Sequence, residues 1–406
     1  MPFSRLARAG LWCAMSLWAL TLFDADVAQA EPFVPKRDAR VLERLPYTPG
    51  DLSIQALRAQ RVTLARDPNN IALAIEAARQ YIGKGRAEGD PRYFGYAQAA
   101  LEPWWRADNA PVEILVLRAD LKQASHNFDG ALNDLNKALQ KDPENINSAL
   151  TRAIILQVLG RYEDAQRDCA TLLDAARYAR DLQLTALTCA ASVASFNGRA
   201  TRSFAVLERV VRTAAGAAQE RQWALTTLAD IATRLGREAA AERYFRAALA
   251  LGENAWLLGA YADLLLDRGR AREVIDLLEN DTSVDNLLLL LALAEQDVGA
   301  PTLDKHVAML RARFRANRLR NDQRHLREEA RFALRLLKDP QKALQLAKVN
   351  WRVQREPEDA RILLRAALAA GRGRAAEPVI EFLRRSGLQD VRLNGLRRQL
   401  RTPVVS

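Results

Sequence analysis

Small residues recur through the middle of this chain at a spacing close to 34, which constrains the fold more than any other feature. An alanine, an aromatic residue and a second alanine stand at Ala119, Phe128 and Ala131 and again 34 positions later at Ala153, Tyr162 and Ala165. An alanine and a glycine then continue the frame, as Ala153 with Gly160, Ala191 with Gly198, Ala229 with Gly236, and Ala262 with Gly269. A period in the thirties indicates one supersecondary unit stacked on copies of itself, which buries a continuous core and leaves a long groove.

Each unit is predicted to hold two helices. From Val112 to Asn145, apolar residues at helical spacing form one stripe that ends near Ala124 and a second that begins at Phe128. A proline-containing turn, residues 142–145, ends the second helix. The repeated alanines allow two helices to cross closely, and the repeated glycines fit a left-handed turn between them.

The segments Ala153-x6-Gly160-Arg161-Tyr162-x2-Ala165 and Leu228-Ala229-x6-Gly236-x4-Ala241-x3-Phe245-x2-Ala248 resemble tetratricopeptide repeats. The resemblance is strong over residues 111–280 and weaker over the rest of residues 52–390. It implies an all-α fold, an α-solenoid of stacked antiparallel helical hairpins wound into a superhelix. It also implies a non-catalytic interaction protein whose ligand contacts lie on the concave face.

The chain is accordingly divided into six segments. They are a signal peptide (1–30), an extended proline-containing leader (31–51), degenerate N-terminal helical repeats (52–110), tetratricopeptide-like repeats (111–280), degenerate basic C-terminal repeats (281–400) and a tail (401–406).

The N-terminus has the layout of a secretory signal peptide. Arg5 and Arg8 precede an apolar stretch, residues 11–23, and a small-x-small site ends at Ala30. An uncleaved anchor is the alternative, but this stretch is short beside the roughly 20 residues that a bilayer requires. We therefore expect cleavage after Ala30 and a mature chain that is soluble in the periplasm or secreted, with no transmembrane segment.

Positive charge is concentrated near the C-terminus. Residues 301–406 contain 25 Lys and Arg against 11 Asp and Glu, whereas the whole chain has a net charge of +11. The densest run comprises Arg311, Arg313, Arg315, Arg318, Arg320, Arg324 and Arg327. In an exported protein this run favours an acidic protein, anionic lipid or acidic polysaccharide over nucleic acid. A solvated arginine-rich face is the alternative.

Two cysteines follow the predicted cleavage site. Cys169 lies on the second helix of one unit and Cys189 on the first helix of the next, and these helices pack together in such an architecture. An oxidising compartment permits a disulfide between them. The alternative is two separate buried thiols.

No catalytic motif is found. The three histidines are His126, placed in a turn, and His306 and His325, placed among arginines, so surface positions are expected for them. The sequence contains no metalloprotease motif, nucleophile elbow, phosphate loop or paired Cys-x-x-Cys. We predict no enzyme activity, no cofactor and no metal site, with a concealed enzyme at the C-terminal end as a weak alternative.

Candidate ligand contacts lie on the first helix of each unit. Residues at i, i+3 and i+7 on the side away from the second helix give Glu113, Val116 and Asp120; Trp223, Thr226 and Asp230; and Trp256, Gly259 and Asp263. In tetratricopeptide proteins this stripe carries ligand contacts, and a tryptophan beside an aspartate suits an apolar or cationic peptide side chain. The alternative is that both tryptophans pack between repeats.

The sequence therefore predicts a periplasmic scaffold that binds a protein or peptide in a concave groove. The second hypothesis is an envelope or exopolysaccharide-assembly factor that binds an acidic polymer or partner through the basic run.

Overall fold

The computed structural model describes residues 52–320 and 322–401, with side chains for residues 55–320 and 322–400. The predicted signal peptide with its cleavage site at Ala30, the leader and residues 402–406 lie outside the described residues. Within the described part every regular element is a helix, and the prediction of an all-α solenoid is confirmed.

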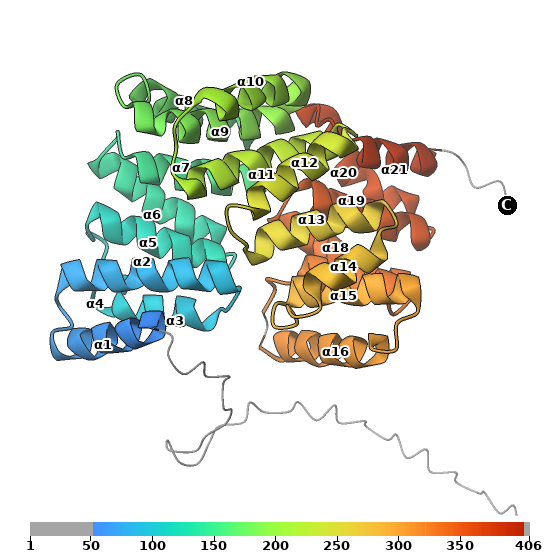
Figure 1. Cartoon of the computed structure of the whole chain (residues 1–406), viewed down its shortest axis with the longest axis horizontal. Helices are drawn as coiled ribbons and strands as arrows, with labels where there is room; N and C mark the ends of the chain where they lie inside the picture. The colour runs from blue at the N-terminus through green and yellow to red at the C-terminus, as the bar shows by residue number, and fades with distance from the viewer. Residues whose placement is uncertain (1–51, 321, 402–406) are drawn as a thin grey trace, which may run out of the picture. The chain divides into compact units, whose positions relative to one another are not determined.

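The helices follow one another as antiparallel hairpins (Figure 1). The first group consists of α1 (Leu52–Arg66), α2 (Ile71–Glu88), α3 (Arg92–Ala100) and the single turn α4 (Glu102–Trp105). A left-handed Gly89 ends α2 shortly before α3 begins, and Leu101 separates α3 from α4.

The middle of the chain forms the most regular hairpins. They comprise α5 (Val112–Ala124), α6 (Phe128–Lys141), α7 (Ile146–Val158), α8 (Tyr162–Ala175), α9 (Gln183–Ala194), α10 (Ala200–Thr213), α11 (Ala218–Arg234), α12 (Glu238–Leu249), α13 (Ala255–Asp267) and α14 (Ala271–Leu278). Asparagine side chains cap several of these helices; Asn145, for example, accepts a hydrogen bond from the backbone N–H of Ser148.

The repeated small residues have the predicted environments. Ala119, Ala153, Ala229 and Ala262 are fully buried at helix crossings. The turn glycines Gly160, Gly198, Gly236 and Gly269 all have φ near +70°, a left-handed conformation that glycine adopts without the steric penalty of a side chain.

The C-terminal group continues the same stacking. It comprises α15 (Asp285–Val298), α16 (Leu303–Leu319), α17 (Leu326–Arg335), α18 (Pro340–Val353), α19 (Pro357–Ala369), α20 (Glu377–Ser386) and α21 (Val391–Arg401). Residues 287–293 in α15 are all buried, as expected for a helix covered on both sides. His306, which we expected at the surface, is only 7% exposed, and its Nδ1 lies 2.8 Å from Glu295 Oε2. That expectation was wrong because His306 faces α15, where the buried carboxylate of Glu295 contacts its ring.

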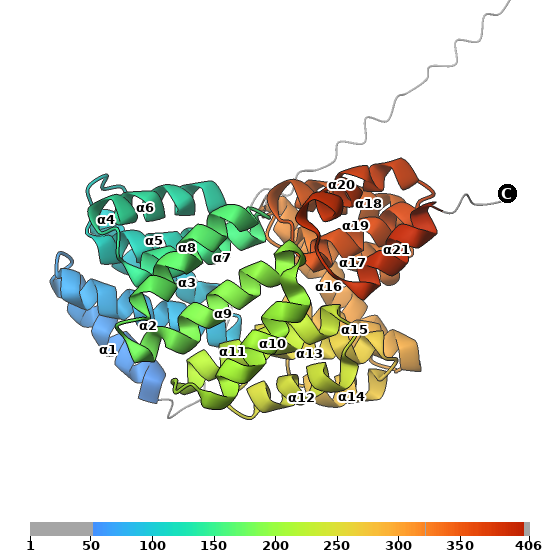
Figure 2. The same ribbon diagram turned by 90° about the horizontal axis from the view of Figure 1, so that it is seen from above.

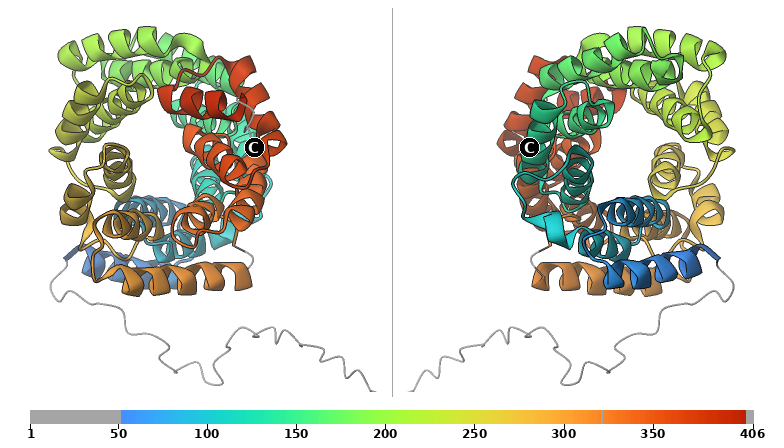
Figure 3. Two further views of the ribbon diagram at one scale, coloured as in Figure 1. Left: turned by 90° about the vertical axis from the view of Figure 1, so that its right-hand side faces the viewer. Right: turned by 90° about the vertical axis from the view of Figure 1, so that its left-hand side faces the viewer.

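The hairpin turns of the middle repeats pack against the C-terminal helices (Figure 2). Gln354 Nε2 lies 3.1 Å from His126 Nδ1, and Arg355 N donates to Val158 O at 2.8 Å. One turn further along the stack, Ala200 N donates to Gln389 Oε1 at 2.9 Å. One hydrophobic cluster accordingly contains residues from 119–193 together with residues from 330–393. Residues 52–401 thus wind far enough around their axis for late helices to meet early ones (Figure 3).

Candidate functional site

A cavity of about 200 Å³ lies on the inner side of this winding. One wall comes from α11, α13 and α15, and the other from α17, α19 and the start of α21. The charged and aromatic residues that line it include Asp230, Arg234, Trp256, Asp263, Arg327, Arg331, Glu356, Glu358, Arg361, Arg365 and Arg392.

The structure brings together only some of the residues that the sequence singled out. Asp230, Trp256, Gly259 and Asp263 line the cavity, and Arg327 from the basic run joins them. Trp256 and Asp263 share a face of α13 because they are seven positions apart. Arg327 reaches the same space from the start of α17.

The remaining groove candidates lie elsewhere. Trp223 is half-buried and packs against the hydrophobic cluster shared by the middle and C-terminal repeats. Thr226 is 1% exposed, and its hydroxyl donates to Gln222 O at 2.7 Å. Asp120, on α5, forms an ion pair with Arg86 at 3.1 Å. Equivalent positions in the 33-residue register therefore have different environments, since neighbouring helices cover Trp223 but leave Trp256 58% exposed.

Ion pairs connect the two walls of the cavity. Asp263 Oδ1 lies 2.6 Å from Arg331 NH2, which joins α13 to α17. Asp267, at the end of α13, pairs with Arg361 of α19 and with Arg392 of α21. Charge-assisted hydrogen bonds of this kind fix geometry as well as adding stability, so these pairs brace the cavity.

A second set of pairs surrounds the start of α19. Glu358 accepts from Arg392 at 2.9 Å and from Arg361 at 3.2 Å. Burial alone would raise the pKa of Glu358, but Arg392, Arg361 and Arg331 hold that pKa far below its usual range. Arg327 lies 2.9 Å from Glu356 Oε2 and 3.5 Å from Asp359 Oδ1. Glu358 is therefore ionised and paired with arginines, whereas burial raises the pKa of Asp359 to about 7.

Two other charged side chains of the cavity are not paired in this way. In the part of the chain whose side chains are described, neither Asp230 nor Arg365 forms a hydrogen bond or ion pair. Burial raises the pKa of Asp230 to about 7, against the opposing influence of Arg234 and Arg392. Burial, followed by the charge of Arg361, lowers the pKa of Arg365 to about 10. Both shifts reflect charges that lack a close counter-charge.

Sequence reasoning missed the contribution of α19 and α21. Arg361 and Arg365 are four apart and so share a helix face, which is a visible signal in the sequence. Their position opposite α13 depends on the superhelical winding, which the spacing of the repeats does not specify.

The basic run divides into residues with different roles. Arg313 donates to Thr282 O at 2.8 Å and pairs with Asp285, Arg318 pairs with Glu329, and Arg324 pairs with Asp322. Arg320 donates to Asn317 Oδ1 at 2.6 Å. Arg311 and Arg315 are exposed on α16, and only Arg327 lines the cavity.

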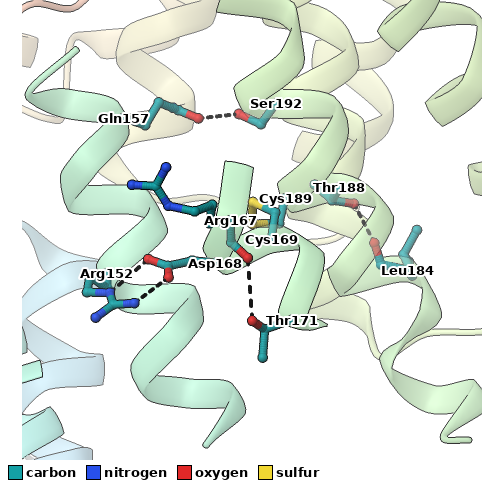
Figure 4. The surroundings of a disulfide bond; sticks show 10 residues. All are labelled: Arg152, Gln157, Arg167, Asp168, Cys169, Thr171, Leu184, Thr188, Cys189 and Ser192. Carbon is teal, nitrogen blue, oxygen red and sulfur yellow. Dashed lines mark hydrogen bonds and ion pairs between the residues drawn. A yellow bond between two sulfur atoms is a disulfide. The ribbon is translucent and has the colours of Figure 1, made fainter. Parts of the chain in front are cut away.

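A disulfide joins Cys169 of α8 to Cys189 of α9 (Figure 4). Their Cα atoms are 5.6 Å apart, and both side chains are buried. On either side of the bond, Arg152 pairs with Asp168 at 2.6 Å and Ser192 donates to Gln157 Oε1 at 2.9 Å. The disulfide therefore links two successive hairpins at a site where polar contacts also cross between helices.

No group of three or more His, Cys, Asp or Glu side chains in the described part of the chain is arranged to hold a metal ion. Among the described helices, none combines the length and the apolar character needed to span a bilayer.

Comparison with known proteins finds no matching protein-family model and no matching curated protein. Solved structures with a similar fold include a tetratricopeptide repeat protein from Parabacteroides merdae, with 15% identity, coverage of 72% of this chain and 98% of that chain, and a TM-score of 0.37. A human IFIT1 dimer with m7Gppp-AAAA is 14% identical, with 82% and 86% covered and a TM-score of 0.46. The APC/C hetero-tetramer Cut9–Hcn1 gives 13% identity, 86% and 93% coverage and a TM-score of 0.39. By its own hairpins, crossing alanines and turn glycines, this chain is a tetratricopeptide-like helical-repeat protein.

Proposed function

We propose that this protein is a non-catalytic interaction scaffold that binds a segment of a partner protein along its inner face. The observation that carries the proposal is the cavity itself, in which an exposed indole, Trp256, lies among polar groups of which Asp230 and Arg365 have no internal partner. Exposed tryptophan and arginine side chains are typical anchors of protein interfaces.

The size of the cavity favours side chains over a small molecule. At about 200 Å³ it is smaller than the roughly 300–1,000 Å³ of drug-sized ligand pockets. One or two side chains of an extended segment fit this volume, while the backbone of the segment follows the stacked helices.

The chemistry of the lining favours binding over catalysis. Of the described residues that line the cavity, none is a histidine, cysteine or serine, and most of the acids are held by arginines. A general base or nucleophile requires a group that is free to exchange protons with a substrate. Asp230 alone meets that requirement, and the hydroxyl in the lining, that of Thr233, donates to Ala229 O at 2.9 Å instead of to Asp230.

A photo-crosslinking amino acid at position 256 tests the proposal in cells that produce the protein. We expect crosslinks to a distinct polypeptide from position 256. The matched control is position 178, where Tyr178 is 93% exposed in the loop between α8 and α9, outside the cavity lining. Equal crosslinking from the two positions, or none from position 256, would contradict binding at the cavity.

The second candidate is binding of an acidic polymer or acidic partner at the surface of α16. Arg311 and Arg315 are the observation in its favour, because both are exposed there. Such binding should weaken steeply with salt. If retention on an acidic polysaccharide matrix is lost in an R311Q/R315Q variant but unchanged in W256A, this candidate replaces the first.

We further propose that the protein works in the periplasm after removal of residues 1–30. The N-terminal charge and apolar pattern supports export, and the Cys169–Cys189 disulfide suits an oxidising compartment. The mature chain should begin at Glu31, as N-terminal sequencing of the periplasmic fraction will show. An Ala30→Arg variant should accumulate the uncleaved form.

A further inference from the structure

The charges of the cavity can be accounted for pair by pair. Most acids of the lining are matched by arginines, as Asp263 is by Arg331 at 2.6 Å and Glu358 by Arg392 at 2.9 Å. Arg335 lies 3.5 Å from Asp297, and Arg234 donates to Ser195 Oγ at 2.6 Å. After this pairing, one carboxylate and one guanidinium remain without a partner among the described side chains, and they belong to Asp230 and Arg365.

These two groups come from opposite walls. Asp230 lies on α11 and Arg365 on α19. Both side chains are half-buried. A charge that is withdrawn from water without a partner is costly, and a ligand group of opposite charge would supply the missing partner. The raised pKa of Asp230 and the lowered pKa of Arg365 agree with this account, since each moves toward the neutral form.

A third group adds to the unpaired donors on α19. Arg361 is only 3% exposed, and its Nε has no hydrogen-bond acceptor in the structure although its two terminal nitrogens are paired. Arg361 precedes Arg365 by four residues and therefore shares its helix face. The α19 side of the cavity thus has surplus donors, whereas the α11 side has a surplus acceptor.

We infer that the cavity selects a polypeptide segment that carries both a basic and an acidic side chain, the basic one bound at Asp230 and the acidic one at Arg365. This inference rests on the proposed function and names the chemistry of its partner. The indole of Trp256 lines the same cavity and is 58% exposed, so it can contact an apolar or cationic side chain of the same segment. A guanidinium donates two parallel hydrogen bonds to a carboxylate, a bidentate geometry that neutral groups do not match. A polyanion can pair with Arg365 but not with Asp230, whose negative charge it would repel.

Selection from a random peptide library displayed on phage tests the inference, with the purified full chain as the target. Wild-type protein should enrich peptides that contain both a basic and an acidic residue. The D230N variant should lose the enrichment of basic residues and keep that of acidic ones, and R365Q should do the reverse. R365K, which keeps the charge, should retain the acidic preference. D276N alters an exposed charge outside the cavity lining and should leave the selection unchanged.

Affinity of a selected peptide makes the test quantitative. D230N and R365Q should each weaken binding of the mixed-charge peptide roughly tenfold or more, as expected when one charged hydrogen-bonding partner is removed. D230N should leave the affinity of a peptide whose basic residue is replaced by glutamine unchanged. The circular dichroism spectrum and the melting temperature of each variant verify that the fold is retained.

The possible failures are distinct. If the wild-type chain enriches peptides that W256A does not, but D230N and R365Q leave the charge preference unaltered, the inference is wrong while the proposed function stands. If wild type and W256A enrich the same peptides, or neither enriches any, the cavity is not a peptide site and both proposals are overturned.

Discussion

Gly160 lies so close to the ring of Phe382 that a Cβ atom on Gly160 would be 2.7 Å from Phe382 Cε2. Gly160 belongs to the turn between α7 and α8, and Phe382 to α20, more than two hundred positions later. The glycine therefore has two roles. Its φ of +72° forms the turn, and its missing side chain admits the aromatic ring of a distant helix.

Substitution at Gly160 should reveal this second role. Gly160→Ala combines an unfavourable left-handed backbone with displacement of Phe382, and we expect a loss of about 2–4 kcal/mol in the free energy of unfolding. Gly269→Ala is the matched control because it has φ +70° but nothing within 4 Å of the added Cβ. It should cost only about 1 kcal/mol. Equal losses in chemical denaturation would mean that the Phe382 contact contributes nothing.

The sequence predicted the repeats well because the constraints on them are local. A buried alanine at each crossing and a left-handed glycine at each turn leave a periodic trace, and Val112–Ala124 and Phe128–Lys141 match the expected helices closely. The helices of the C-terminal repeats were expected only from the weaker resemblance over the rest of residues 52–390.

The candidate site was only partly predictable, because it depends on contacts between residues far apart in the chain. The seven-residue spacing correctly placed Trp256 and Asp263 on one helix face. The same spacing predicted that Trp223 would contact a ligand, whereas Trp223 packs against a hydrophobic core. Arg361 and Arg365 enter the site because the stack turns until α19 faces α13. The curvature of the stack is the sum of small rotations between successive repeats. Single positions in the sequence do not reveal these rotations.

Removal of the disulfide should destabilise the fold without changing it. Cys169 and Cys189 are separated by 20 positions, and closing a loop of that length stabilises a protein by about 3 kcal/mol. A C169A/C189A variant should lose this amount in urea unfolding. Reductant should lower the stability of the wild type towards that of the variant and should leave the variant unaffected. A wild-type protein insensitive to reductant would show that the two sulfurs are not bonded in solution.

His126 should make the contact between the middle and C-terminal repeats sensitive to acid. Burial lowers the pKa of His126 to about 4 from an ordinary value of 6.5, and Nδ1 accepts from Gln354 at 3.1 Å in the neutral form. Below pH 6.5 the unfolded chain binds a proton that the folded chain does not. This contribution to stability is therefore complete above pH 6.5 and is lost as the pH falls towards 4.

A His126→Asn variant isolates this effect. Asparagine accepts the same hydrogen bond and tolerates the positive φ of 57° at this position. Its melting temperature should match that of the wild type at pH 7.5 and exceed it at pH 4.5. A constant difference at all pH values would exclude titration of His126 as the cause.

Asp230 should have the opposite pH dependence, which separates it from His126 in the same range. Its pKa is about 7 in the folded protein, against 3.8 for an ordinary aspartate, with burial as the main cause. Arg234 on its own helix and Arg392 of α21 favour the ionised form, whereas Glu356 and Glu358 near the start of α19 oppose it. Between pH 4 and 7 the unfolded chain releases a proton that the folded chain keeps. Stability therefore falls as the pH rises through this window and is constant above it.

An Asp230→Asn variant removes this penalty while keeping the shape of the side chain. Its melting temperature should exceed that of the wild type at pH 8, and the difference should disappear near pH 4, where both forms are neutral at this position. A bound cationic side chain would stabilise the carboxylate, so the selected mixed-charge peptide should bind the wild type more tightly at pH 8 than at pH 6, and D230N should show no such dependence. Asp276→Asn, at an exposed position on α14, is the control for a general change in net charge. If D230N follows the wild type in stability across the whole range, Asp230 is ordinarily solvated and is not the unpaired acceptor of the cavity.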